Sequence, residues 1–513
     1  MIIKMNRTIN YSLILSLFFV LVVIPVSCSK ESATENPQRE TDLPLVKISG
    51  EHANIDTKTT LNGVVTSWIA ATDKVGIYSS QARTATAEGG SEVVNAEFTA
   101  ASSGVNSSFN GTMYWGAANT SHTFYAYYPY AAGSPASTVV PVSLAAAQTQ
   151  ASANSNAHLD ALDFLVATPV TVTSPNNTNP VANDVNLSYN HLFTVLEFQI
   201  KGTGQLKAVK LSSNSTLAFS GGTIDITQAT PGSGIAYTLA GLTGTSSEAV
   251  VTLTTPATLT ATNTDTKVYM VINPGTPTGN CTIELSVDGT TWSYLLKAVP
   301  VGGFKRGIKY VVSVDASSAS ALGTGEVVSL TGKVWMDRNL GATRVAQSST
   351  DADAYGFLYQ WGRLTDGHQI RTSGTTPTLA GSDTPGHANF ILTSSIPYDW
   401  RSSKNDNLWQ GVSGTNNPCP SGFRIPTEAE LTNERLSWGS NNSEGAFASP
   451  LKLTLAGNRS PSDGSLGNFG TAGHYSSSTV SGAYSRNLYF STTGAGITTN
   501  SRAYGFAVRC IKD

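Results

Sequence analysis

Alternating apolar and polar residues are the main pattern along this chain, and they predict strands. Runs with a period of two cover 185–189 and 196–200, and a further strand is expected over 309–314. A period of two places every second side chain on one face of a strand, so these strands should be half buried. The stretch 282–297 predicts a hairpin, because two alternating runs flank Asp288-Gly289, the pair that favours a two-residue type I′ turn.

Helical signals are short by comparison. Thr427, Glu428 and Glu430 match a capping box, in which a threonine hydroxyl and a glutamate side chain each accept from the other's backbone N–H. A second brief helix is expected over 157–165. The predicted fold class is therefore mainly β, with a mixed C-terminal part.

Composition divides the chain into parts. Residues 28–44 are polar and contain two prolines, which suits a tether, and residues 316–325 are small and aperiodic, which suits a flexible linker. Five of the eight tryptophans lie in 326–513, among glycine-rich turns. At roughly 150 residues per domain, a chain of 513 residues predicts about three domains.

Charge excludes one class of protein. The chain has 31 basic and 34 acidic residues, a net charge of −3, and only 13% of its residues are charged. A nucleic-acid-binding protein needs clustered Lys and Arg against phosphate, so no nucleic-acid partner is expected. Aromatic residues are spread throughout, which argues against a disordered chain. An uncharged chain rich in Thr and Ser is typical of extracellular β modules.

The N-terminus predicts export. A basic segment precedes an apolar run over 11–26, which is shorter than the roughly 20 residues that span a bilayer. Residues 1–27 are therefore predicted to be a signal peptide rather than a transmembrane anchor. Cys28 follows directly, and this arrangement resembles the lipobox of bacterial lipoproteins, except that Pro25 stands where that family has an aliphatic residue. The resemblance implies acylation of the Cys28 thiol and a lipid anchor in the outer membrane.

Three cysteines remain after Cys28. Cys281 opens a strand-like run and is expected to be a small buried side chain. Cys419 and Cys510 are then the pair for a disulfide, which export permits. This bridge would close a loop of about 90 residues, which the chain-entropy model values at roughly 4 to 5 kcal/mol.

Five segments, in order along 45–315, carry a family resemblance. They include a Trp followed by D-K-V-G-I-Y, then F-Y-A-Y-Y-P-Y and D-F-L-V-A, and they lie at 67–78, 124–130, 163–167, 187–200 and 302–314. On these segments the region resembles the fimbrillin family of Bacteroidales surface proteins. The resemblance implies two tandem β-sandwich domains, at 45–185 and 186–315.

A second set of segments lies in 326–513. They are G-K-V-W-M-D-R-N-L-G (332–341), Y-G-F-L-Y-Q-W-G-R (355–363), P-C-P-S-G-F-R-I-P-T (418–427) and V-R-C (508–510). The region resembles the major paralogous domain family named from Fibrobacter succinogenes and, more weakly, the formylglycine-generating-enzyme and C-type-lectin folds. The resemblance implies an irregular α+β domain in which Cys419 and Cys510 are structural.

No catalytic, cofactor or metal site is expected. The motifs H-E-x-x-H, G-x-S-x-G and G-x-x-x-x-G-K-[ST] are absent, and helix capping accounts for Glu428 and Glu430. Asp351 and Asp353 begin like an EF-hand loop, but Gly362 stands at the twelfth position, where a calcium loop needs Glu.

Trp400 and Trp409 are the candidate ligand contacts. Both lie in the polar stretch 393–417, outside the family motifs, and ligand contacts collect on exposed loops. An exposed indole ring can stack on a sugar or anchor a protein partner.

The favoured function is a fimbrial subunit at the cell surface, serving as a tip adhesin. In the fimbrillin family a trypsin-like protease trims the lipidated N-terminus after an Arg, which removes a strand, and the resulting groove accepts a donor strand from the next subunit. Arg39 is the candidate cleavage site, whereas Lys58 lies too far into the first strand-like run. The expected partners are other fimbrial subunits, a host or bacterial glycan or protein ligand, and the outer membrane before processing.

Two alternatives stay open. One is a lipid-anchored surface protein that binds glycan or protein and never polymerises. The other is an enzyme of the formylglycine-generating type, which would need a reactive, copper-binding cysteine pair.

Overall fold

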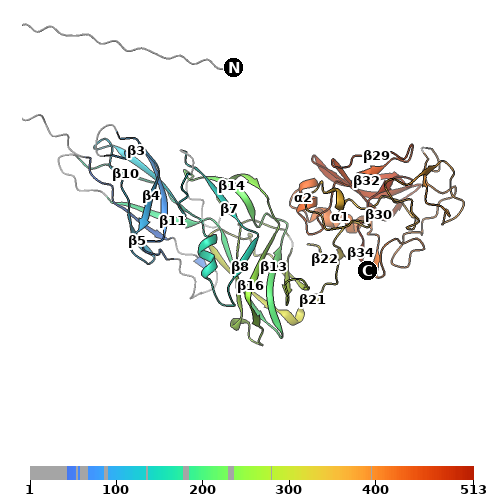
Figure 1. Cartoon of the computed structure of the whole chain (residues 1–513), viewed down its shortest axis with the longest axis horizontal. Helices are drawn as coiled ribbons and strands as arrows, with labels where there is room; N and C mark the ends of the chain where they lie inside the picture. The colour runs from blue at the N-terminus through green and yellow to red at the C-terminus, as the bar shows by residue number, and fades with distance from the viewer. Residues whose placement is uncertain are drawn as a thin grey trace, which may run out of the picture. The chain divides into compact units, whose positions relative to one another are not determined.

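The computed structural model describes residues 43–52, 56–57, 67–85, 90–133, 137–176, 184–228, 236–278, 280–393 and 395–513 (Figure 1). These residues form a mainly β structure with a few short helices, as the sequence pattern predicts. Cys28 and Arg39 lie outside the described residues, as does Lys58.

Eight strands form the first sheet, in the order β10-β6-β3-β4-β5-β1-β11-β9. Their bounds are β1 (Ile48–His52), β3 (Lys74–Arg83), β4 (Glu92–Ala100), β5 (Asn106–Asn110), β6 (Ser121–Tyr128), β9 (Leu165–Ala167), β10 (Val170–Thr173) and β11 (Val185–His191). Because β9 pairs with both β11 and β6, the seven strands from β6 to β9 close into a ring. Its apolar core contains the fully buried Trp68 and Trp115.

Two further sheets enclose a second core. One has the order β17-β12-β20-β2 and the other β21-β19-β18-β13-β16-β8. The first contains β2 (Asp56–Thr57), β12 (Thr194–Lys201), β17 (Lys267–Ile272) and β20 (Ile308–Asp315). The second contains β8 (Ala147–Gln150), β13 (Gln205–Ser212), β16 (Glu248–Thr258), β18 (Asn280–Ser286), β19 (Trp292–Ala298) and β21 (Ser320–Ala321). Apolar side chains of both sheets pack into one cluster, which includes Phe198 and Ile283.

The chain passes between these two groups of sheets more than once. Strand β7 (Val139–Leu144) pairs with β14 (Phe219–Asp225), which also pairs with β15 (Leu239–Thr243). Strand β8 pairs with β16, so β7 and β8 lie with strands that follow residue 194. The chain then returns to the first sheet in β9, β10 and β11. The predicted domain limits at 45–185 and 186–315 stay a prediction, and strand pairing does not divide at a single residue.

The strands expected over 185–189, 196–200 and 309–314 are confirmed as β11, β12 and β20. The expected hairpin is present as β18 and β19. The prediction of a two-residue turn is wrong, because Ser286 pairs with Trp292 and five residues lie between them. The Asp288 carboxylate accepts from the backbone N–H groups of Thr290 and Thr291 at 2.7 and 2.6 Å. This side-chain turn takes the place of the two-residue type I′ turn.

Two other expectations change. Residues 316–325 are not a featureless linker, because they carry the 3₁₀ turn η3 (Ala316–Ser318) and then β21, which pairs with β19. The helix expected over 157–165 is a 3₁₀ helix, η1 (Ala157–Leu162), and a further 3₁₀ turn, η2, covers Asn263–Asp265.

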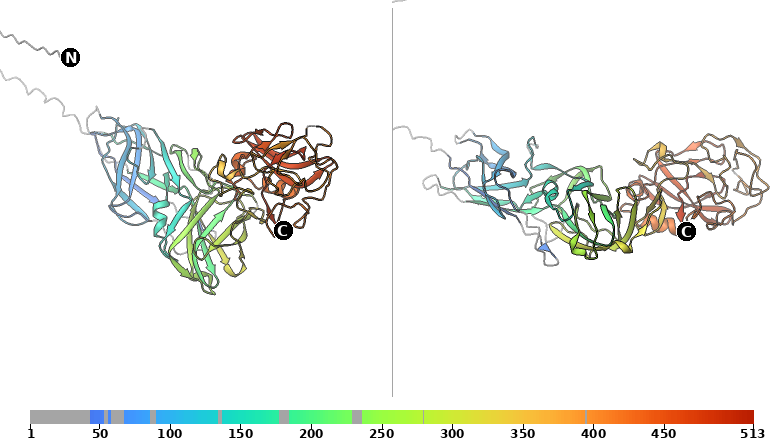
Figure 2. Two further views of the ribbon diagram at one scale, coloured as in Figure 1. Left: turned by 45° about the vertical axis from the view of Figure 1, so that its right-hand side comes forward. Right: turned by 60° about the horizontal axis from the view of Figure 1, so that its bottom comes forward.

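The part of the chain after residue 325 consists largely of loops and short strands, orange to red in both views of Figure 2. Its helices are α1 (Glu428–Leu436), α2 (Ser443–Ala448) and the 3₁₀ turn η4 (Ala352–Ala354). The capping box predicted at the start of α1 is confirmed. Sheet order is β22-β23-β34-β27, β24-β33-β28-β29, β25-β26 and β30-β31-β32.

The strands of this region have the following bounds. They are β22 (Glu326–Val328), β23 (Val334–Met336), β24 (Tyr359–Gln360), β25 (Thr375–Thr376), β26 (Phe390–Ile391), β27 (Phe423–Arg424), β28 (Asn458–Arg459), β29 (Leu466–Gly467), β30 (Ala472–Ser481), β31 (Tyr484–Ser491), β32 (Gly494–Ser501), β33 (Gly505–Phe506) and β34 (Ile511–Lys512). The helix α1 packs against the sheet of β30, β31 and β32 through Leu431, which shares a core with Leu488 and Phe490.

Candidate functional site

The N-terminal strand β1 lies inside the first sheet, between two strands from later in the sequence. It pairs parallel with β11 and antiparallel with β5. Its side chains alternate between core and surface, so that Ile48 and His52 are buried while Glu51 is exposed. A strand with a neighbour on each side satisfies backbone groups in both directions. Loss of β1 would therefore leave the facing edges of β5 and β11 without partners.

The middle of β1 has a strict size limit. Gly50 is buried, and a Cβ atom there would lie 2.8 Å from the ring of Phe109 and 2.8 Å from the ring of Tyr189. Both rings are buried in the core of the first sheet, so neither can move away at low cost. Only glycine therefore fits at position 50 without displacing one of these rings.

His52 ends β1 in an aromatic environment. Its ring lies 4.1 Å from the ring of Trp68 and 6.0 Å from that of His191, and neither of its ring nitrogens has a hydrogen-bond partner among the described residues. Burial and the charge of His191 lower the pKa of His52 to about 4. The imidazole of His52 at the end of β1 is therefore neutral at pH 7.

Two residues of the family-like segments meet beside His52. His191 lies at the end of β11, and its Nδ1 is 2.8 Å from Oδ1 of Asp163. A cavity of about 270 Å³ adjoins them, and Asp73 and Asp160 also line it. Burial raises the pKa of Asp160. Among the described residues, no cluster of His, Cys, Asp or Glu has the arrangement to hold a metal ion.

A groove lies at one side of the two sheets that enclose the second core, the sheet of β12 and the sheet of β13. Strand β2 follows β1 along the chain and pairs with β20 at Ile308 and Lys309, the only pairs between these strands in the described residues. A groove of about 580 Å³ lies beside β19 and β20, lined among others by Leu295 and Val314. Apolar core residues of both sheets therefore border this groove.

The opposite side is sealed by two glutamine side chains of β8. Gln148 accepts from the backbone N–H of Val271 at 3.0 Å and donates to its carbonyl at 2.6 Å. Gln150 accepts from the N–H of Tyr269 at 2.8 Å and donates to the carbonyl of Lys267 at 3.0 Å. These amides satisfy the edge of β17 as a neighbouring strand would, so this edge offers no pairing positions at those residues.

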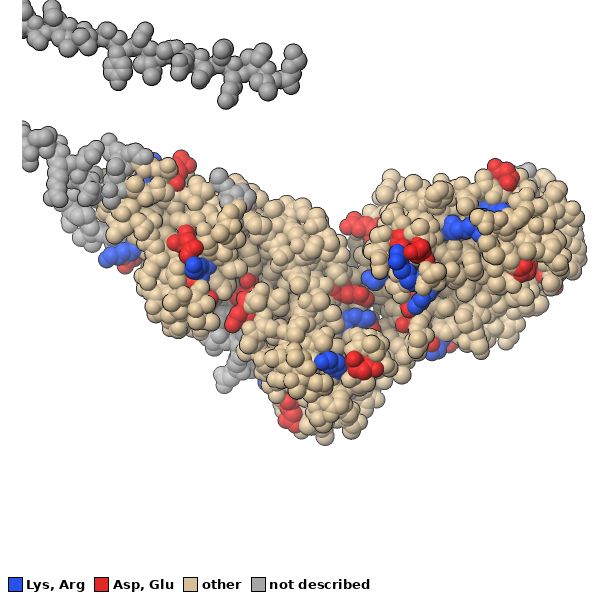
Figure 3. Space-filling model, viewed as in Figure 1, with Lys and Arg blue, Asp and Glu red and all other residues tan. Residues whose placement is uncertain are grey.

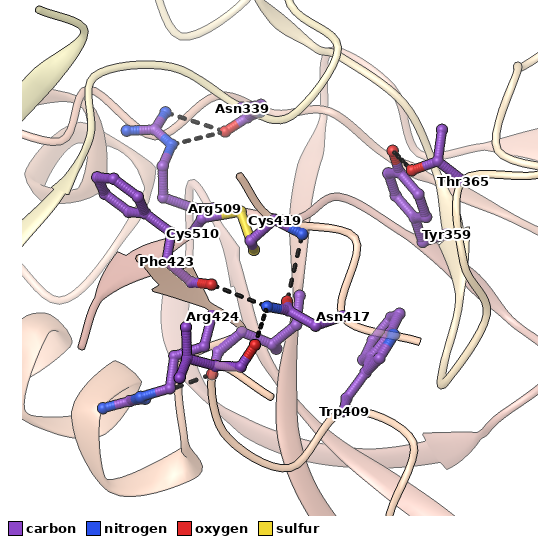
Figure 4. The surroundings of a disulfide bond; sticks show 12 residues. Asn339, Tyr359, Thr365, Trp409, Asn417, Cys419, Phe423, Arg424, Arg509 and Cys510 are labelled. Carbon is purple, nitrogen blue, oxygen red and sulfur yellow. Dashed lines mark hydrogen bonds between the residues drawn. A yellow bond between two sulfur atoms is a disulfide. The ribbon is translucent and has the colours of Figure 1, made fainter. Parts of the chain in front are cut away.

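The predicted disulfide between Cys419 and Cys510 is present (Figure 4). Cys510 is fully buried, and the backbone N–H of Cys419 donates to Asn417 Oδ1 at 3.2 Å. Asn417 in turn donates to the carbonyl of Phe423 at 2.8 Å, as Figure 4 shows. The bridge ties the last strand to the loop before β27. Cys281 is a free, buried cysteine, as expected.

The expectation that Trp400 and Trp409 lie on an exposed loop is wrong. Both are fully buried. The indole N–H of Trp400 donates to the carbonyl of Trp361 at 2.7 Å, and that of Trp409 donates to the carbonyl of Asn416 at 3.0 Å. A buried indole with its N–H satisfied is a core residue, so the exposure on which a ligand contact depended is absent.

Sequence reasoning missed three features of this chain: the glycine at the centre of β1, the buried His52 at its end and the glutamine pair on β8. The glutamines alternate at 148 and 150, which is the period of a strand, but their partners lie more than 100 residues away in sequence.

Among the described residues, no helix is both long and apolar enough to cross a membrane.

Comparison with known proteins adds distant structural likenesses. A protein from Bacteroides uniformis named for cell adhesion shares 17% identity over 54% of this chain and 96% of its own, with a TM-score of 0.35. A second such protein, from Bacteroides ovatus, shares 17% identity over 55% of this chain and 95% of its own, with a TM-score of 0.34. A fimbrial protein from Bacteroides ovatus shares 11% identity over 92% of this chain and 99% of its own, with a TM-score of 0.27. No curated protein matches the chain.

The assignment depends on a family model rather than on these likenesses. The model described as fimbrillin-like matches residues 57–334, slightly more than half of the chain. The match covers the second pair of sheets and most strands of the first, and it ends at the start of β23. The C-terminal resemblance to the major paralogous domain family stays a prediction. The chain belongs to the fimbrillin-like family.

Proposed function

We propose that this chain is a fimbrial tip subunit that accepts a donor strand from the next subunit in the place of β1. Membership of the fimbrillin-like family indicates a fimbrial or adhesive role at the cell surface. The observation that carries the finer proposal is the position of β1, an N-terminal strand inserted between β5 and β11.

Replacement of β1 is physically reasonable because the strand fills a slot. Its removal would leave hydrogen-bonding groups of β5 and β11 unpaired and would uncover core residues such as Phe109. An extended strand from another subunit could restore both ladders, which is how strand addition gains affinity. The size limit at Gly50 restricts the sequence of the donor strand, which needs glycine at the matching position.

The position of β1 changes the expected effect of N-terminal trimming. Arg39 lies before the first described strand, so a cut after Arg39 leaves β1 attached to the chain. A cut that detaches β1 must fall between His52 and Trp68, and Lys58 is the one basic residue there. We propose that trimming at Arg39 releases the lipidated segment, and that opening of the slot needs displacement of β1 or a cut after Lys58.

A tip position is supported by the pairing of β34. This strand pairs with β23 and β27 inside the C-terminal part, and Ile511 is fully buried. The adjacent Cys510 is fixed by its disulfide to Cys419. A strand held in this way is not free to act as a donor strand, whereas the slot of β1 can still accept one. A subunit that accepts a strand and donates none would end a fibre.

The alternatives receive less support. A formylglycine-generating enzyme would need a reactive cysteine pair, and Cys419 and Cys510 are joined to each other. A lipid-anchored protein that never polymerises would keep acylated Cys28 as its first residue. Lipid attachment, export to the outer membrane and partnership with other fimbrial subunits are parts of the proposal.

The test is the N-terminal sequence of the mature chain recovered from purified fimbriae, with immunogold labelling of the same fibres. The proposal expects a start at residue 40 or at residue 59, and label at the fibre ends. A start at acylated Cys28, with no label on fibres, would favour the non-polymerising surface protein.

A further inference from the structure

A stacked pair of tyrosines, Tyr484 exposed and Tyr398 half-buried, marks a surface of the C-terminal part that the buried tryptophans do not account for. The ring of Tyr398 stacks on that of Tyr484, with their centroids 5.4 Å apart and their planes at 25°. Tyr484 is 36% exposed, and the neighbouring Ile396 is 82% exposed. The two tyrosines come from segments 86 residues apart in sequence, so the fold brings these rings together at the surface.

The backbone holds Tyr398 in an unusual conformation. Its φ is +58°, in the left-handed region that a bulky side chain rarely adopts. Strain of this kind persists where the surroundings fix the residue, and it collects at sites with a function. Here the carbonyl of Tyr398 accepts from the backbone N–H of Arg502 at 2.9 Å and from the Ser501 hydroxyl at 2.7 Å.

A buried arginine holds the second half of the pair. Arg502 is fully buried, and its guanidinium donates to the carbonyls of Gly482 and Tyr484 at 2.9 and 3.4 Å. The same group bonds to Asp406 at 2.6 Å. Arg502 therefore bonds to the backbone at both tyrosines, and each ring packs on the other, so the pair is already assembled before a ligand binds.

Hydrogen-bonding groups lie near the backbone that carries Tyr484. The exposed side chain of Lys404 forms an ion pair with Asp406 at 3.2 Å and donates to the carbonyl of Gly482 at 3.5 Å, two residues before Tyr484. The ion pair between Lys404 and Asp406 carries no net charge. Charged side chains are sparse on the face of the molecule that Figure 3 shows. A neutral ligand with both apolar and hydroxyl groups suits such a surface better than an anion or a cation.

We infer that Tyr398 and Tyr484 form a platform for a neutral saccharide, with Lys404 and Asp406 at its rim. A pyranose ring has an apolar C–H face that stacks on an aromatic ring, and hydroxyls that bond to carboxylate and ammonium groups. The inference rests on the adhesive part of the proposed function. It needs no strand exchange, so binding by the isolated chain is separable from assembly.

The test is saturation-transfer NMR on the full purified chain, with lactose, cellobiose, maltose and mannobiose as probes and a polyproline peptide as a non-sugar probe. We expect transfer to at least one disaccharide, through its C–H protons. Tyr484→Ala should weaken that binding at least about fivefold, as truncation of a contact hot spot does. Tyr484→Phe keeps the ring and should retain most of the affinity.

A second variant separates binding from folding. Tyr398→Gly removes a ring and suits the positive φ, so relief of backbone strain offsets part of the lost packing, and the variant should fold yet lose saccharide transfer. Absence of transfer to every disaccharide, transfer that survives Tyr484→Ala and Tyr398→Gly, or binding of the peptide alone would overturn the inference. Each result is read on the isolated chain, so it leaves the test of fimbrial assembly unaffected.

Discussion

Removal of the disulfide should selectively destabilise the C-terminal part of the chain. The perturbation is the double substitution Cys419→Ser and Cys510→Ser. The two cysteines are 91 residues apart in sequence, and the chain-entropy model gives about 4.6 kcal/mol for a loop of that length at 25 °C. A urea slope of roughly 2 to 3 kcal/mol/M converts this loss into a midpoint lower by about 2 M.

The assay is urea unfolding followed by tryptophan fluorescence. Five of the eight tryptophans lie after residue 325, and Trp335, Trp361, Trp400 and Trp409 among them are almost fully buried, so the signal reports mainly on that part. The reduced natural chain should unfold at the same midpoint as the double variant. Cys281→Ala is the matched control, because it removes a cysteine from the second core and should leave the C-terminal transition in place. An oxidised chain, a reduced chain and a double variant that share one midpoint would refute the reasoning.

Three further predictions concern the sheets formed by the chain before residue 325. Gly50→Val should destabilise the first sheet by about 2 kcal/mol or more, because its side chain meets two buried rings, whereas Ser49→Val should be tolerated; equal melting temperatures would contradict this. The free energy of unfolding of the first sheet should fall by about 3 kcal/mol as the pH drops from 6.5 to 4, because His52 is protonated in the unfolded chain but stays neutral in the folded one over this range. Above pH 6.5 this stability should be retained. His52→Phe should remove that component from pH-dependent urea unfolding, and an unchanged pH profile would count against it. Gln148→Leu should leave the N–H and carbonyl of Val271 unpaired and cost about 1 to 3 kcal/mol in thermal unfolding, while exposed Thr149→Leu serves as the control; equal losses in the two variants would rule out the edge-sealing role.

The strands were predictable because burial on one face leaves a period of two in the sequence. Strands β11 and β12 follow that pattern, and the capping box at Thr427 is a local signal contained within four residues. The disulfide was predictable for a different reason, since three cysteines and one strand-like context leave a single natural pair.

Other features depend on contacts that a local pattern does not contain. The polar neighbours of Trp400 and Trp409 indicate a loop, but a loop folded back on the core can bury an indole and satisfy its N–H with a backbone carbonyl. The turn after β18 follows the Asp288 side chain rather than the favoured dipeptide conformation. Residues 316–325 join a sheet because β19 offers a free edge to β21, and composition alone carries no information on that edge.

The same limit applies to the candidate site. Glycine at position 50 has no distinctive neighbours in sequence, and its role becomes visible only through Phe109 and Tyr189. Tyr398 and Tyr484 are joined by Arg502, which lies more than 100 residues after the first of them.

The most direct test of the account is to lock β1 in its slot and to measure fibre incorporation. Ser49 and Ser108 are paired across β1 and β5 on the solvent side, so Ser49→Cys with Ser108→Cys should join these strands by a disulfide. The matched control, Thr99→Cys with Asn110→Cys, joins β4 to β5, which stay together in either state. The account predicts that the oxidised β1 lock is absent from purified fimbriae, that mild reductant restores its incorporation, and that the control incorporates throughout. Incorporation of the oxidised β1 lock at the level of the unmodified chain would contradict the claim that a donor strand takes the place of β1.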